Sequence, residues 1–147
     1  MKYFSLIFLF VLALSCKNNS ETNEAGDAAT TQVAHSEEMK ESISRGGKIY
    51  SNFCASCHLS NGEGIEGVFP PLKNSDWLTE KRKETIHAVK HGVSGPIEVN
   101  GKEYDNLMPS LGLTDEEVAD VMNYINNSWG NSVTKPVTVE EVAAITK

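Results

Sequence analysis

Apolar residues recur at helical spacing along much of the chain, and polar or glycine-rich segments separate the stretches in which they do. From residue 38 to Cys54 the apolar positions are three or four apart, which predicts a helix that runs into the Cys54–His58 segment. Gly46 lies on the apolar face of this helix. Because glycine weakens a helix, its place on that face indicates that a second helix crosses closely there.

Two further helical patterns follow in the second half of the chain. Residues 75–91 predict one or two helical segments, which Gly92 ends. Thr114 and Glu117 form a complete capping box ahead of a helix whose buried stripe runs to Trp129 and which Gly130 ends. The buried stripe consists of Val118, Val121, Met122, Ile125 and Trp129. Thr138 repeats the capping signal and predicts a short final helix near 139–146.

The apolar pattern changes to alternation between residues 93 and 104. Ile97 and Val99 alternate with polar residues, and Asn100-Gly101 follows at once. Asn-Gly is the strongest short signal for a type I′ hairpin. The sequence therefore predicts an all-α domain with one small two-stranded hairpin at about 96–105.

The first 16 residues have the pattern of an export signal. Lys2 precedes an apolar run over residues 4–14, which is too short to span a membrane but suits a secretory signal. Ser15 before Cys16 resembles the lipobox of bacterial lipoproteins, in which the cysteine becomes a lipidated first residue, although Ala13 stands where leucine is usual. An ordinary signal peptide, cleaved nearby, is the alternative. The lipobox predicts a lipid anchor on the periplasmic side of a bacterial membrane.

Composition divides the rest of the chain into three parts. Residues 17–37 contain few large apolar side chains and predict a flexible tether. Residues 38–130 form one small domain, and residues 131–147 form a tail. The formal net charge is −7, which argues against nucleic-acid binding and favours protein partners that carry a basic docking patch.

The Cys54-Ala55-Ser56-Cys57-His58 segment carries the chemistry. Two thiols three positions apart and a histidine directly after them form the C-x-x-C-H pattern of c-type haem attachment. Each thiol can add to one haem vinyl group, and His58 can then bind the iron from one face. A zinc site would need a second Cys/His pair, and a thioredoxin-like dithiol would need a βαβ setting. A disulfide between Cys54 and Cys57 is the remaining alternative.

Two residues downstream are candidates for completing the iron site. Pro70 has no N–H and is restrained by Pro71, so its carbonyl can accept a hydrogen bond from the second nitrogen of His58. Met108 lies on a loop next to Pro109, where its thioether can be held over the ring as the sixth ligand. The other candidates for that position are Met39, Met122, His35, His87 and His91.

Over about residues 40–130 the chain resembles the class I cytochromes c, and in particular a bacterial subgroup of them. The resemblance rests on Gly46, Tyr50, Cys54, Cys57, His58, Pro70, Leu72, Met108, Pro109, Val121 and Tyr124. It implies crossing N- and C-terminal helices around one covalent haem c, with His58 and Met108 as axial ligands. It also implies that Leu72 packs on the ring, and we expect Tyr50 and Trp77 to contribute to the haem pocket.

These features predict a membrane-tethered electron carrier rather than an enzyme. With both axial positions of the iron filled, no small-molecule substrate binds, and the partners are a redox donor and a redox acceptor. Two alternatives stay open. The chain is either an electron-transfer subunit of a larger oxidoreductase, or a haem enzyme or gas sensor whose sixth position is free.

Overall fold

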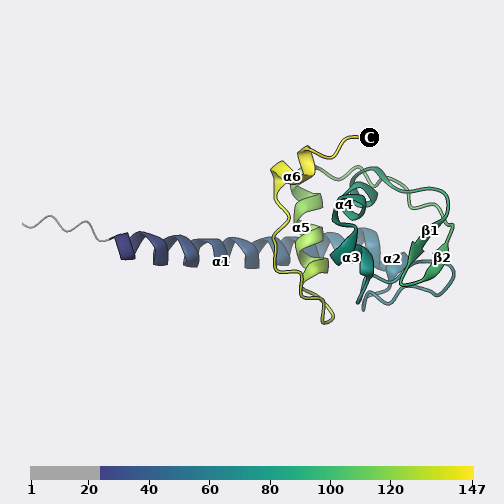
Figure 1. Ribbon diagram of the computed structural model, residues 1–147, viewed down its shortest axis with the longest axis horizontal. Helices are drawn as coiled ribbons and strands as arrows, with labels where there is room; N and C mark the ends of the chain where they lie inside the picture. Colours follow the sequence, from purple (N-terminus) through teal and green to yellow (C-terminus); the bar gives the residue numbers. More distant parts are fainter. Residues whose placement is uncertain (1–23) are drawn as a thin grey trace, which may run out of the picture.

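The first helix and the C-x-x-C-H motif form one continuous helical path. The computed structural model describes residues 24–147, in which helix α1 (Glu24–Ile49) continues through a π-helical turn η1 (Tyr50–Cys54) into helix α2 (Ala55–His58) (Figure 1). The predicted helix that leads into Cys54 is confirmed. The π-helical turn is not expected from the sequence, and such turns are frequent at functional sites.

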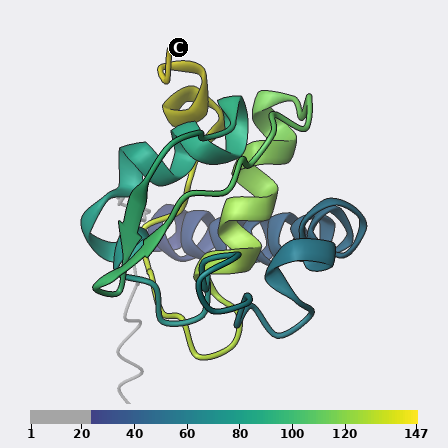
Figure 2. The ribbon, with the colours of Figure 1, turned by 90° about the vertical axis from the view of Figure 1, so that its right-hand side faces the viewer.

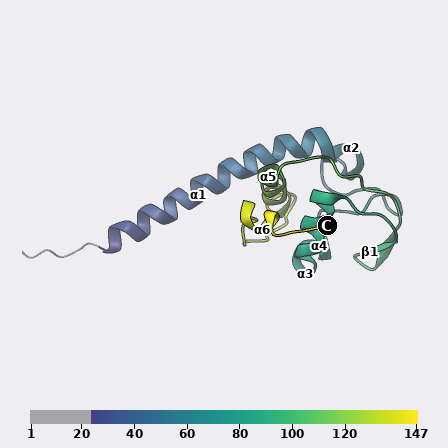
Figure 3. The same ribbon diagram turned by 90° about the horizontal axis from the view of Figure 1, so that it is seen from above.

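Helix α1 begins earlier than the sequence predicts. The sequence indicates a flexible tether over residues 17–37, whereas the structure is helical from Glu24 onward. Alanine and glutamate favour a helix here, and each residue added to an existing helix gains a hydrogen bond without a new nucleation step. Figures 1 and 3 show that this half of α1 projects away from the other elements. The predicted leader, Cys16 and the start of the tether lie outside the described residues.

The second half of α1 crosses helix α5 (Asp115–Asn126), as Figure 2 shows. Gly46 lies at the crossing, where a Cβ atom would overlap the backbone carbonyl of Asp120. The predicted close crossing at this glycine is confirmed. Asp120 is only 4% exposed, and it accepts hydrogen bonds from Ser42 Oγ at 2.7 Å and from Arg45 Nη2 at 2.8 Å. These bonds satisfy a buried carboxylate that would otherwise destabilise the crossing.

The start of α5 agrees with the sequence, but its end does not. Thr114 Oγ1 accepts the N–H of Glu117, and the Glu117 carboxylate accepts the N–H of Thr114, which confirms the capping box. The helix ends at Asn126 rather than before Gly130. Trp129 has a left-handed φ of 54°, which a helix cannot contain. Four residues of the predicted stripe are buried on α5: Val118, Val121, Met122 and Ile125.

Two short helices and a hairpin connect α2 to α5. Helices α3 (Asp76–Glu80) and α4 (Arg82–His91) confirm the two-segment alternative for residues 75–91. Strands β1 (Ile97–Val99) and β2 (Lys102–Tyr104) pair antiparallel, with Ile97 opposite Tyr104. Asn100 and Gly101 both have positive φ, as a type I′ turn requires, so the predicted hairpin is confirmed.

The C-terminal tail packs back across α4 and α5. Helix α6 (Val139–Ala143) starts where Thr138 predicts, because Thr138 Oγ1 accepts the N–H of Glu141, but it is shorter than the expected 139–146. Val142 is fully buried. Arg82 on α4 donates two hydrogen bonds to the Glu141 carboxylate, at 2.7 and 2.8 Å. Within residues 24–147, no helix is both long and apolar enough to cross a bilayer.

Candidate functional site

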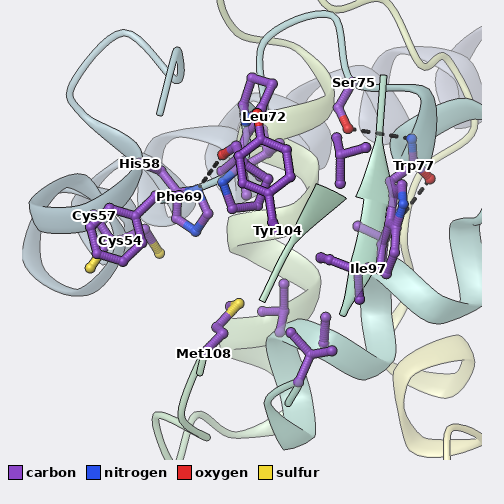
Figure 4. A pocket seen from close by; sticks show the side chains of 18 of the residues that line it. Cys54, Cys57, His58, Phe69, Leu72, Ser75, Trp77, Ile97, Tyr104 and Met108 are labelled. Atoms are coloured by element: carbon purple, nitrogen blue, oxygen red, sulfur yellow. Dashed lines mark hydrogen bonds between the residues drawn. The ribbon is translucent and has the colours of Figure 1, made fainter. Parts of the chain in front are cut away.

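An apolar cavity of about 260 Å³ opens beside the C-x-x-C-H motif. Its wall comes from η1 and α2, from α3 and the loop before it, from α4 and α5, from the hairpin and from the segment around Met108 (Figure 4). Residues far apart in the sequence therefore meet around one space. Cys54, Cys57, His58, Pro70, Leu72, Trp77 and Met108 all line this cavity.

The two cysteines lie side by side on the helical path at the cavity. Both are free thiols, so the alternative of a disulfide between them does not apply to the structure. Cys54 is only 8% exposed, and burial raises the pKa of its thiol to about 11. Both sulfurs border the same apolar space, which is the arrangement that thioether attachment of one haem requires.

His58 is held by the hydrogen bond that the sequence predicts. Its Nδ1 donates to the carbonyl of Pro70 at 2.9 Å, and the side chain is 7% exposed. Burial lowers the pKa of the imidazole, and the bond to Pro70 partly opposes that effect. Because Nδ1 is occupied, Nε2 is the nitrogen that can bind iron.

Met108 reaches the cavity from a segment that is tied to the backbone of Val93. The N–H of Met108 donates to the Val93 carbonyl, and the N–H of Val93 donates to the Met108 carbonyl, both at 2.9 Å. In Figure 4 the Met108 sulfur points into the space between this segment and His58. The two hydrogen bonds thus fix the main chain of Met108 at the cavity wall.

The other candidates for a sixth ligand are placed less suitably. Met122 lines the cavity but belongs to the buried face of α5. Met39 on α1 and the two histidines of α4 are not among the residues that line the cavity. The His87 and His91 rings lie against each other with centroids 5.0 Å apart and planes tilted by 60°, and His91 Nε2 donates to the carbonyl of Ile145 in the tail. His35 precedes the residues whose side chains the structure describes.

Of the residues predicted to line the haem pocket, Tyr50 is the one that lies outside the cavity wall. It is only 2% exposed, but it does not line the cavity. Its hydroxyl donates to the Leu59 carbonyl at 2.6 Å, and its ring packs against Tyr124 and Trp129. Tyr50 therefore packs on the side of the C-x-x-C-H motif that faces the crossing with α5, and not on the cavity side.

Several wall residues are missed by reading the sequence alone. Tyr104 is 4% exposed and points into the cavity in Figure 4. Ile97, Val99 and Tyr104 share the inner face of the hairpin. The alternation of Ile97 and Val99 is a signal for one inner face of the hairpin, but it does not say that this face covers the cavity. Trp77 fixes that placement, because its indole N–H donates to the Glu98 carbonyl at 2.7 Å.

Comparisons with known proteins show the family of this chain. The sequence model of the cytochrome c family matches residues 43–129. Cytochrome c-552 of Thermus thermophilus is 42% identical over 106 residues, which cover 66% of this chain and 80% of that protein. The gluconate 2-dehydrogenase cytochrome c subunit of Pantoea cypripedii is 31% identical over 145 residues, and the match covers 94% of this chain but 31% of that subunit. The alcohol dehydrogenase (quinone) cytochrome c subunit of Gluconacetobacter polyoxogenes is 34% identical over 103 residues, 22% of its length.

The chain belongs to the cytochrome c family. Its fold is that of the class I cytochromes c, and its cofactor is covalently bound haem c. The residues present fit this cofactor, since two thiols, a buried histidine and a thioether all border one apolar cavity. The function of the chain is electron transfer through that haem.

Proposed function

We propose that this chain is a single-haem electron carrier in which His58 and Met108 bind the iron from opposite sides. The observation that supports this most directly is that both side chains border the same cavity, each held by main-chain hydrogen bonds. When bound, the haem supplies an iron that alternates between two oxidation states. On this proposal the chain is not itself an enzyme.

The side chains around the iron site have separate tasks. Cys54 and Cys57 hold the cofactor covalently, so it cannot dissociate. His58 is oriented by Pro70, and the neutral thioether of Met108 favours ferrous iron and so raises the reduction potential. Leu72 and Trp77 exclude water from the cavity, which lowers the local dielectric constant.

The mouth of the cavity is the place where a redox partner would dock. Phe53, Val68 and Leu107 line the cavity and are 46%, 38% and 68% exposed. Exposed apolar side chains at such a mouth allow a partner to approach closely and to leave again quickly. The net charge of −7 favours partners with a basic rim.

Replacing Met108 tests the proposed ligation. In Met108→Ala we expect the iron to lose its thioether, because no other side chain on that segment can replace it. The reduction potential should fall, and carbon monoxide should bind to the reduced variant but not to the wild-type protein. Met39→Leu, which alters a methionine outside the cavity, should behave as the wild type. Rapid binding of carbon monoxide by the wild-type protein would favour the alternative of an open sixth position.

A fixed subunit is the second candidate function. Relatives of this chain are named as cytochrome c subunits of dehydrogenases, although the chain spans less than a third of their length. A fixed subunit would elute from a detergent extract of its native membrane together with a larger complex. A free carrier would elute at the size of one chain.

We further propose that Cys16 is lipidated and that the domain is exported and held at the periplasmic side of a bacterial membrane. The apolar run and Ser15 before Cys16 support this. Mass spectrometry of the mature protein should show a first residue at Cys16 that carries a diacylglyceryl group. A mature chain without lipid would contradict the anchor and leave the electron carrier unaffected.

A further inference from the structure

We propose that Gly92 is a positioning residue for Met108, because its missing side chain lets the methionine segment pack directly on the end of α4. This inference rests on the proposed role of Met108 as an axial ligand. It adds a structural requirement at Gly92, a residue that does not line the cavity.

The main chain around Gly92 leaves no room for a side chain. Gly92 ends α4 with its N–H bonded to the Ala88 carbonyl, and its φ is +83°. A Cβ atom at this position would lie 2.6 Å from the Met108 carbonyl oxygen, 2.8 Å from the Ser110 nitrogen and 3.0 Å from the Pro109 carbonyl carbon. All three are backbone atoms, so a flexible side chain cannot move aside to relieve the contact.

The methionine segment is attached to the end of α4 on both sides of this contact. Val93 and Met108 exchange two hydrogen bonds of 2.9 Å, and Ser110 Oγ donates to the Lys90 carbonyl at 3.1 Å. The end of α4 is itself fixed, because Lys90 forms an ion pair with Asp115 at 2.9 Å. A shift of the segment at Gly92 would therefore break bonds that hold Met108.

The histidine side of the cavity contains a similar arrangement. Gly64 has a φ of +62°, and a Cβ atom there would lie 2.6 Å from the carbonyl oxygen of Pro70, which accepts the hydrogen bond from His58. Each of the two proposed ligands is thus supported by a main-chain segment that packs on a glycine.

Gly95 separates the effect of space from the effect of backbone conformation. Its φ of +85° is close to that of Gly92, but an added Cβ atom would meet nothing within 4 Å. Gly92→Ala and Gly95→Ala therefore carry a similar conformational strain in the same loop. Only Gly92→Ala pushes on the Met108 segment.

The experiment compares two holoprotein variants, Gly92→Ala and Gly95→Ala, by the weak far-red absorption that a methionine sulfur gives ferric haem. We expect Gly92→Ala to lose most of this band, to bind carbon monoxide when reduced and to have a lower reduction potential. Gly95→Ala should keep the band. Equal bands in Gly92→Ala and Gly95→Ala would overturn the inference.

A further variant keeps the test decisive if Gly92→Ala does not accumulate with haem. Ser110→Ala adds no atom and removes only the bond to the Lys90 carbonyl. It should weaken the far-red band at elevated temperature before the helices unfold, as followed by circular dichroism. A band that is lost only together with the helices would overturn the inference. If the wild-type protein lacked the band, or if Met108→Ala kept it, the proposed ligation itself would fail.

Discussion

His58 shows how burial and one hydrogen bond select the chemical form of a side chain. Burial disfavours the charged imidazolium and lowers the pKa of His58, while the bond to Pro70 works in the opposite direction and has the smaller effect. The result is a neutral ring with its proton on Nδ1. That form presents the lone pair of Nε2, which is what an iron ligand needs.

Burial acts on Cys54 and Tyr50 in the opposite sense, because these groups are neutral when protonated. It raises the pKa of the Cys54 thiol to about 11, and it also raises the pKa of the Tyr50 hydroxyl. Tyr50 therefore keeps its proton and can donate it to the Leu59 carbonyl. The charged residues of this domain are excluded from the cavity wall, which contains no Asp, Glu, Lys or Arg among the described residues.

At the level of single residues, the parts of the site that the sequence predicts are those with a local signal. Cys54, Cys57 and His58 are adjacent in the chain, and Pro70 has a conformation that its neighbour restricts. Gly92 could be identified only as the end of a helix. Its second role depends on contact with a segment 16 positions away, for which the local sequence carries no signal.

Among the elements, the C-terminal tail is joined to α4 by the ion pair between Arg82 and Glu141, and this pair can be tested by mutation. Arg82 on α4 binds the Glu141 carboxylate and also donates to the Pro136 carbonyl at 2.8 Å. In Arg82→Gln we expect the free energy of unfolding to fall by about 2 kcal/mol, since charge-assisted bonds of a half-buried group are lost. Denaturant unfolding measures this. Lys83→Gln removes the same charge from an exposed site on α4 and should change little.

The same ion pair gives the tail a dependence on pH. The hydrogen bonds from Arg82 lower the pKa of Glu141 below its ordinary value. The stabilisation is therefore complete above the pKa of the unfolded chain, and it is lost as the pH falls toward the lower pKa of the folded protein. Glu141→Gln should reduce the loss of stability in acid. An unchanged acid profile, or equal stability of Arg82→Gln and Lys83→Gln, would contradict a structural role for the pair.

Capped helix starts and the hairpin turn could be predicted better than the other helix boundaries. The capping box at Thr114 and the Asn100-Gly101 turn are specified by a few neighbouring residues, and both are confirmed. The start of α1 and the end of α5 depend on helix propagation and on tertiary packing, for which the sequence has weaker signals. The π-helical turn η1, in which Tyr50 and Cys54 are buried, also lacks a local signal in the sequence.

At the scale of the whole molecule, charge and apolar surface act on association in opposite directions. The net charge of −7 repels a second copy of the chain, whereas the apolar mouth favours close contact. Electron self-exchange between oxidised and reduced copies measures this balance without a partner protein. We expect its rate to rise with ionic strength, because salt screens the repulsion between like charges.

Two matched variants locate the surface through which the molecules exchange electrons. Leu107 is 68% exposed at the cavity mouth, and Val139 is 42% exposed on α6 and does not line the cavity. Leu107→Glu and Val139→Glu add the same charge, so any general electrostatic effect is equal in both. Leu107→Glu should slow self-exchange several-fold more than Val139→Glu, because only Leu107→Glu places a carboxylate at the cavity mouth, where two copies of the protein would come into contact. NMR line broadening in mixtures of the two oxidation states measures both rates. The far-red band must persist in both variants for the comparison to apply. Equal rates in the two variants would mean that electrons leave the molecule elsewhere than at the cavity mouth.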